Sequence, residues 1–102
     1  MIIFVDVDDT LVRSFGTKRI PITSVIKTIR QLKIKGAVLY CWSSGGSEYA
    51  RASAIELGLD DCFIGYLPKP NVMIDDQPFH SWRSLRHVYP LQADSLLDEP
   101  KI

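Results

Sequence analysis

Short apolar runs separated by polar segments extend along most of the chain, and their spacing predicts alternating strands and helices. Ile2–Val5 is a run of four apolar residues rich in β-branched and aromatic types, which is typical of a strand buried on both faces. From Thr23 the apolar positions recur at helical spacing, and Gly36 predicts the end of that helix. Ala37–Trp42 is a second apolar run. A helix joining two such strands forms a right-handed βαβ unit, so the sequence predicts an α/β fold with a parallel sheet.

The second half of the chain continues this alternation with shorter elements. Glu48–Leu57 is predicted to form a helix that ends at Gly58. Further strands are predicted at Cys62–Leu67, at Val72–Ile74 and, as a candidate last strand, at His87–Tyr89. These strands would extend the same sheet.

Two segments are predicted to lack regular structure. Leu11–Ile22 contains glycine, proline and scattered basic residues, which is typical of a loop or short flap. Residues 92–102 are acidic and weakly periodic, so we expect a loose C-terminal tail. Because a chain of 102 residues can bury one modest core, residues 1–102 are predicted to form a single domain.

Composition narrows the class of protein. The chain is 46% hydrophobic and 24% charged, and twelve basic residues balance twelve acidic ones, as in an ordinary soluble globular protein. Nucleic acid is not indicated as a partner, because non-specific binders usually carry an excess of lysine and arginine. The apolar runs are too short for a membrane span and no leader pattern opens the chain, so we expect a cytoplasmic protein without a membrane partner. Cys41 and Cys62 lack metal-binding spacing and are predicted to be buried, reduced thiols.

Polar residues stand where the apolar runs end. In chain order they are Asp6 with Asp8, Ser43 with Ser44, Lys69, and Asp75 with Asp76. The carboxyl ends of parallel strands share one edge of a sheet, where ligands bind, so we expect these residues to converge. Neighbouring carboxylates require a cation, and oxygen ligands suit Mg2+. Taken singly, each feature has an ordinary alternative: a solvated acidic turn, a strand-to-helix turn, an exposed lysine, or a helix N-cap.

The order Asp-x-Asp-x-Thr, then Ser, then Lys, then Asp-Asp resembles the four motifs of the haloacid dehalogenase superfamily, which consists largely of Mg2+-dependent phosphatases with an aspartyl-phosphate intermediate. The resemblance spans Ile2 to Pro78, and Asp6–Leu11 is its most specific part. Ile74–Pro78 is also similar to the fourth motif of small uncapped members, including the carboxy-terminal-domain phosphatases that act on phosphoproteins. The resemblance implies a three-layer, Rossmann-like α/β fold with flanking helices and no cap domain.

The resemblance also implies roles for the first two motifs. Asp6 would attack the phosphorus, and Asp8 would act as general acid and then as general base. Ser43 would bind the transferring phosphoryl group, supported by the backbone amides of Ser44, Gly45 and Gly46. The choice between Ser43 and Ser44 is open; Ser43 is preferred because it directly ends the apolar run.

The last two motifs would supply charge. Lys69 would neutralise the phosphate and Asp6, a role that lysine performs well as a point charge. Asp6, Asp8 through its backbone carbonyl, Asp75 and Asp76 would be the Mg2+ ligands. Within the last pair, Asp76 is preferred as the direct ligand and Asp75 as a second ligand or a support for it.

Our first hypothesis is therefore a Mg2+-dependent phosphomonoester hydrolase. Without a cap, its open site would accept a phosphorylated small molecule or macromolecule, or be covered by a second subunit of a homo-oligomer. One alternative is a non-enzymatic phosphoacceptor resembling response-regulator receiver domains, although their order of motifs differs from that of this chain. Another is a degenerate scaffold that has lost activity, although no motif carboxylate is missing.

Overall fold

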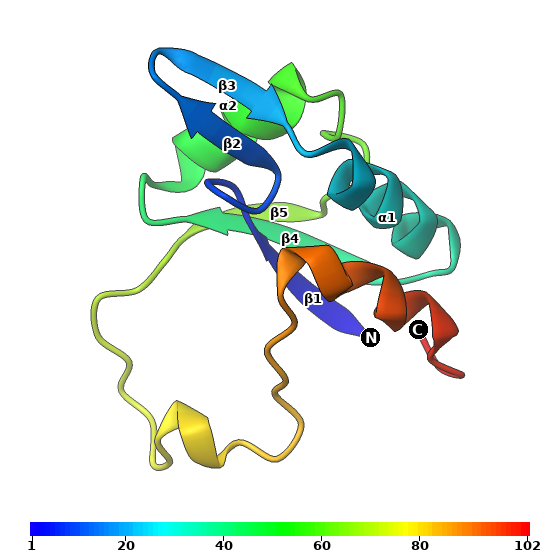
Figure 1. The fold of residues 1–102 in the computed structure, drawn as a ribbon. Helices are drawn as coiled ribbons and strands as arrows, with labels where there is room; N and C mark the ends of the chain where they lie inside the picture. Colours follow the sequence, from blue (N-terminus) through cyan, green and yellow to red (C-terminus); the bar gives the residue numbers. More distant parts are fainter.

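A three-stranded parallel sheet is the central element of the α/β fold in the computed structural model, which describes residues 1–102 (Figure 1). The strands, in spatial order, are β1 (Ile2–Asp6), β4 (Val38–Ser43) and β5 (Gly65–Pro68). Strand β4 lies in the middle and pairs with both neighbours. The register places Asp6 of β1 beside Trp42 of β4, and Ser43 of β4 beside Pro68 of β5. The predicted parallel sheet is confirmed, and these strand ends meet at one edge.

Two helices connect the strands, and both cover the same face of the sheet (Figure 1). They are α1 (Thr23–Ile34) and α2 (Ser47–Glu56), close to the predicted helices. Gly36 and Gly58 follow them with φ of 99° and 68°, a left-handed conformation that glycine adopts without strain, so both predicted stops are confirmed. No helix of the structure has the length and apolar character needed to cross a membrane.

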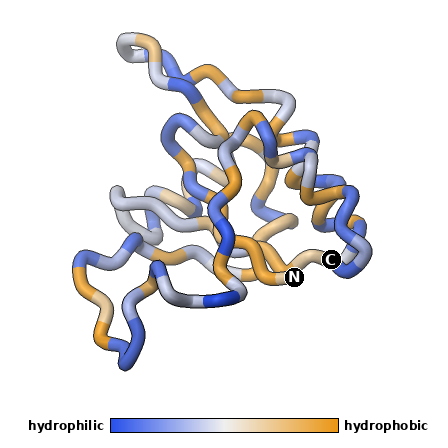
Figure 2. The backbone as a smooth tube through the Cα atoms, turned by 60° about the horizontal axis from the view of Figure 1, so that its bottom comes forward, coloured by the Kyte–Doolittle hydropathy of each residue, from blue (hydrophilic) through white to orange (hydrophobic).

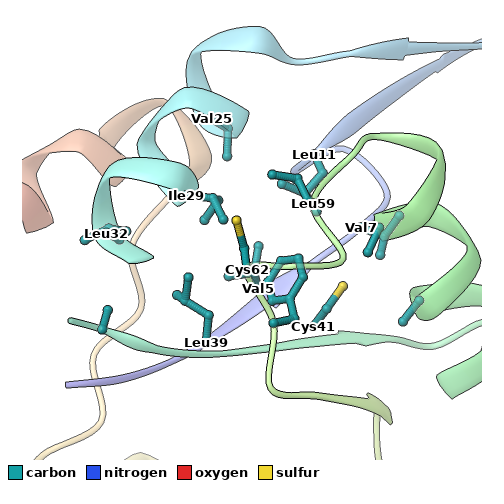
Figure 3. Packing of buried hydrophobic residues seen from close by; sticks show 14 of the residues in the cluster. Val5, Val7, Leu11, Val25, Ile29, Leu32, Leu39, Cys41, Leu59 and Cys62 are labelled. Atoms are coloured by element: carbon teal, nitrogen blue, oxygen red, sulfur yellow. The ribbon is translucent and has the colours of Figure 1, made fainter. Parts of the chain in front are cut away.

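The hydrophobic core lies between these helices and the sheet. In Figure 3, Ile29 and Leu32 of α1 face Leu39 of β4. Cys41 is fully buried in this core and Cys62 nearly so, and both thiols are free, as predicted. Burial, with a smaller contribution from the negative charge of Asp6, raises the pKa of the Cys41 thiol to about 12.

Strand β1 is buried on one face only, so the prediction of burial on both faces is wrong. Its side chains alternate between Val5, which is 5% exposed, and Ile2 and Phe4, which are 68% and 43% exposed. The apolar run is visible as the orange tube that begins at the N-terminus in Figure 2. Phe4 packs against the rings of Tyr40 and Trp42, with centroids 5.1 and 5.0 Å apart, and this aromatic face lies opposite the two helices.

The flap predicted at Leu11–Ile22 is a regular β-hairpin. Strands β2 (Val12–Phe15) and β3 (Lys18–Pro21) pair antiparallel, and Gly16, with φ of 63°, lies in the two-residue turn. A turn with positive φ matches the twist of a two-stranded hairpin. The prediction of an irregular segment is therefore wrong, because the turn between the short strands was not recognised.

The segment between β5 and the C-terminal helix forms a long loop that leaves the sheet (Figure 1). Its only regular element is the short 3-10 helix η1 (Phe79–Ser81), and the strands predicted at Val72–Ile74 and His87–Tyr89 do not form. A further parallel strand needs a crossover of roughly a dozen residues. Only residues 69–71 separate β5 from Val72, so the chain cannot return to the start of the sheet.

The C-terminal segment differs from the loose tail predicted for residues 92–102. Residues 90–98 form the 3-10 helix η2 (Pro90–Asp98), which packs against α1. Leu96 is 8% exposed and belongs to the core, and this burial anchors the segment.

Candidate functional site

Asp6 is the last residue of β1, and two side chains hold its carboxylate. Oδ1 lies 3.2 Å from Nζ of Lys69, and Oδ2 accepts a hydrogen bond from the Thr10 hydroxyl at 3.2 Å. The Asp6 side chain remains 30% exposed. The carboxylate is thus oriented by its neighbours and still accessible to solvent.

Lys69 reaches Asp6 because the backbone pairing of β4 and β5 continues one residue beyond β5. The Lys69 N–H donates to the Ser43 carbonyl at 2.9 Å. Its flanking prolines, Pro68 and Pro70, restrict the local backbone. The ammonium group lies 5.7 Å from the centroid of the Trp42 ring, a cation–π arrangement. The expected convergence of Asp6 and Lys69 is confirmed.

A tight turn follows Asp6 and changes the direction of the chain. The Val7 carbonyl accepts the N–H groups of Thr10, Leu11 and Val12 at 3.2, 2.9 and 3.2 Å. Asp9 has a φ of 59°, a left-handed conformation that aspartate tolerates better than most residues. Because β1 ends at Asp6, the alternation of side chains along a strand does not determine where the Asp8 side chain lies.

Asp8 has a partner that the sequence did not indicate. Its Oδ1 accepts a hydrogen bond of 2.6 Å from the hydroxyl of Tyr49 on α2. This hydrogen bond is the main reason why the pKa of Tyr49 is raised, and burial contributes less. Tyr49 lies inside the predicted helix Glu48–Leu57, and its position in the first turn after the second motif is the one sequence feature that could have pointed to it.

The turn between β4 and α2 presents Ser44 and Gly45 at the surface and buries Ser43. The Ser43 Oγ accepts the Gly45 N–H at 3.0 Å, and the Ser43 carbonyl accepts the Gly46 N–H at 3.1 Å. Gly46 is the N-cap of α2, with no side chain capping the helix. Unpaired amides at such a helix start attract anions. Both serines therefore remain candidates for binding phosphate.

Asp75 and Asp76 are not brought to this edge. They lie in the exposed loop after β5, where the Asp75 Oδ1 accepts the Gln77 N–H at 2.9 Å in a local turn. Nowhere in the structure do three or more histidine, cysteine, aspartate or glutamate side chains form a group that could hold a metal ion. The four-carboxylate set expected from the motifs is thus not assembled.

A smaller Mg2+ site is compatible with the donors that are present. Asp6 is the last residue of β1, and Asp8 follows two residues later. Mg2+ is commonly bound by one or two carboxylates, with water and substrate phosphate oxygens as the other ligands. The Asp6 carboxylate and the Asp8 backbone carbonyl are oxygen donors of the kind that such an ion takes, and Lys69 compensates part of the charge of Asp6.

Comparison with known protein families, curated proteins and solved structures found no match to this chain.

Proposed function

We propose that the chain is a Mg2+-dependent phosphomonoester hydrolase that acts through an aspartyl-phosphate on Asp6, as in small uncapped members of the haloacid dehalogenase superfamily. The contact between Asp6 and Lys69 is the observation that carries the proposal. A carboxylate at the open end of a strand, oriented by a lysine and a threonine hydroxyl, is arranged as a nucleophile beside a positive charge that can also receive phosphate.

The reaction would proceed in two steps. An oxygen of Asp6 attacks the phosphorus, the bond from phosphorus to the ester oxygen breaks, and Asp8 gives its proton to the leaving alcohol. Asp8 then takes a proton from water as the water oxygen attacks the phosphorus. The bond from phosphorus to Asp6 breaks, which releases inorganic phosphate and restores the Asp6 carboxylate and the protonated carboxyl group of Asp8.

The phosphoryl group would bind between Lys69 and the turn that precedes α2. Lys69 supplies a full positive charge, and the Ser44 amide lies just before the start of the helix, where the Gly45 N–H already donates to the Ser43 Oγ. The hydroxyl of Ser43 accepts the Gly45 N–H, so its own proton remains free to donate. Ser44, which is exposed, is the other candidate donor.

The Asp6 carboxylate and the Asp8 backbone carbonyl would hold Mg2+, which supplies additional positive charge at the reacting phosphate when bound. Asp75 and Asp76 as further ligands remain a prediction. They could contribute only if the loop after β5 moved, because that loop leaves the sheet (Figure 1).

The proposal includes the finer expectations about the fold and its setting. A third layer would lie on the aromatic face formed by Phe4, Tyr40 and Trp42. The open site would accept a phosphorylated small molecule or macromolecule, or would be covered by a second copy in a homo-oligomer. We also propose a cytoplasmic location, with neither a membrane nor nucleic acid as a partner.

Purified protein with Mg2+ should hydrolyse an aryl phosphate, and chelation of the metal should stop turnover. Asp6→Asn should abolish activity because the amide oxygen is a poor nucleophile. Asp9→Asn is the matched control, since it makes the same change in the turn that follows Asp6 and asparagine tolerates the φ of 59°. Activity that survives in Asp6→Asn would refute the mechanism. A long-lived phosphoprotein without turnover would instead support a phosphoacceptor, and the absence of both would indicate a degenerate scaffold.

A further inference from the structure

We infer that Tyr49, oriented by Arg19, is a positioning residue that holds the carboxyl group of Asp8 for proton transfer; this inference rests on the proposed function. Asp8 is exposed and lies in a turn beyond the end of β1, where nothing in the strand fixes its side chain. The 2.6 Å hydrogen bond from Tyr49 is the contact that orients it. A general acid must lie within hydrogen-bonding reach of the atom that it protonates, so its orientation affects the rate.

The contacts of Arg19 give the Tyr49 hydrogen bond a direction. Nη2 of Arg19 donates to the Tyr49 hydroxyl at 3.2 Å. Arginine has donors but no acceptor, and a phenol has one proton, so the Tyr49 proton is left for Asp8. Arg19 thus selects the rotamer of the hydroxyl in which the proton points toward the carboxylate.

Arg19 is itself held firmly against α2. It donates to the buried Ser53 hydroxyl at 2.9 Å and forms an ion pair with Glu56. Its guanidinium carbon lies 5.3 Å from the centroid of the Tyr49 ring. Because Arg19 belongs to β3, these contacts fasten the hairpin to α2 beside the site.

The turn before α2 is shaped to the ring of Tyr49. A Cβ atom placed on Gly45 would lie 3.0 Å from Cδ2 and 3.1 Å from Cγ of Tyr49, closer than normal contact. Glycine at this position lets the ring lie against the turn. Tyr49 is therefore fixed by the turn on one side and by Arg19 on the other.

The geometry distinguishes the two oxygens of Asp8. Oδ1 accepts the Tyr49 hydrogen bond, so Oδ2 is the atom left to exchange a proton with the leaving group and with water. Loss of the Tyr49 hydroxyl would let the carboxyl group rotate. The acid step would then be slowed, while the nucleophile and the phosphate-binding groups would stay in place.

The test compares kcat/KM of Tyr49→Phe with that of the wild type for a series of phosphomonoesters with leaving alcohols of increasing pKa. For an alkyl phosphate, which needs acid catalysis, we expect a loss of about 10- to 100-fold, part of the range that general acid catalysis contributes. For an aryl phosphate with a good leaving group, we expect a loss of less than about 3-fold, because the leaving oxygen needs little protonation. A plot of log kcat/KM against the pKa of the leaving alcohol should therefore be steeper for Tyr49→Phe than for the wild type.

The matched control is Tyr66→Phe, which removes a phenol whose 3.5 Å contact is to the Asp60 carbonyl. It should leave the whole series unchanged. Arg19→Gln is a second variant that frees the Tyr49 hydroxyl without removing it, and it should show the same steepening to a smaller degree. The midpoint of urea unfolding is measured for every variant, so that loss of the fold can be distinguished from loss of the contact.

Each outcome has one interpretation. An equal loss for every leaving group, or no loss, in a Tyr49→Phe protein that folds would overturn the positioning role while the hydrolase proposal stands. If the wild type shows no hydrolysis that depends on Asp6, the proposed function fails first and the positioning role fails with it. A loss confined to poor leaving groups supports both.

Discussion

Replacing Lys69 with methionine should lower the rate of catalysis strongly and the free energy of unfolding only slightly. The change removes the charge and keeps an unbranched side chain that can pack on the Trp42 ring. Two unit charges 3.2 Å apart interact by about 5 kcal/mol at an effective dielectric of about 20, but by only about 1 kcal/mol in bulk water. The side chains of Lys69 and Asp6 are 37% and 30% exposed, so water screens the pair and its net contribution to stability should be at most about 1 kcal/mol.

Catalysis should depend on the same charge far more strongly. A preorganised charge at a developing oxyanion is worth about 3 to 4 kcal/mol, because a substrate excludes water from the site. Lys69→Met should therefore lower kcat/KM for an aryl phosphate by about 100- to 1000-fold in steady-state kinetics with Mg2+. Urea unfolding of the same variant should show a loss of no more than about 1 kcal/mol.

Lys27→Met provides the control for Lys69→Met, because Lys27 is an exposed residue of α1 outside the site. It should change neither kcat/KM nor the free energy of unfolding. If Lys69→Met reduced stability by several kcal/mol, or left the kinetics intact, the role assigned to the contact between Lys69 and Asp6 would be wrong.

Two further predictions concern the fold. Leu96→Ala should lower the free energy of unfolding by about 2 to 3 kcal/mol in a urea titration, because Leu96 is 8% exposed in the core; a change below about 0.5 kcal/mol would contradict the packing of η2 on α1. The raised pKa of the Cys41 thiol predicts a pH dependence of stability. Since the folded value is about 12 and the ordinary value 9.0, the contribution of the neutral thiol is complete below pH 9 and is lost as the pH rises toward 12. Cys41→Ala should flatten this decline, and a decline unchanged by the substitution would assign it to other groups.

The elements that sequence reasoning predicted correctly are those set by local pattern and connectivity. The spacing of apolar residues from Thr23 and the glycine at Gly36 were sufficient for α1. The βαβ order then required a parallel sheet, and a parallel sheet brings strand ends together. That is why Asp6 and Lys69, which are distant in the sequence, could be expected to meet.

The predictions that the structure contradicts depend on the lengths of connections and on the packing between elements, which the periodicity of the sequence does not encode. The run at Val72–Ile74 has the composition of a strand, but the three residues after β5 are too few for a crossover. The apolar character of Ile2 and Phe4 gave no sign that the helices cover one face of the sheet only. Tyr49 could be linked to Asp8 only once α2 and the turn after β1 had been placed in space.

The most direct test of the central claim is to look for the phosphoryl group on the chain itself. Acid quenching during turnover of an aryl phosphate with Mg2+, followed by mass analysis of peptides, should find a phosphate on the peptide that contains Asp6. The modification should be labile to hydroxylamine, as an acyl phosphate is, and absent from Asp6→Asn. Turnover without this modification, or phosphate on a different residue, would contradict the account.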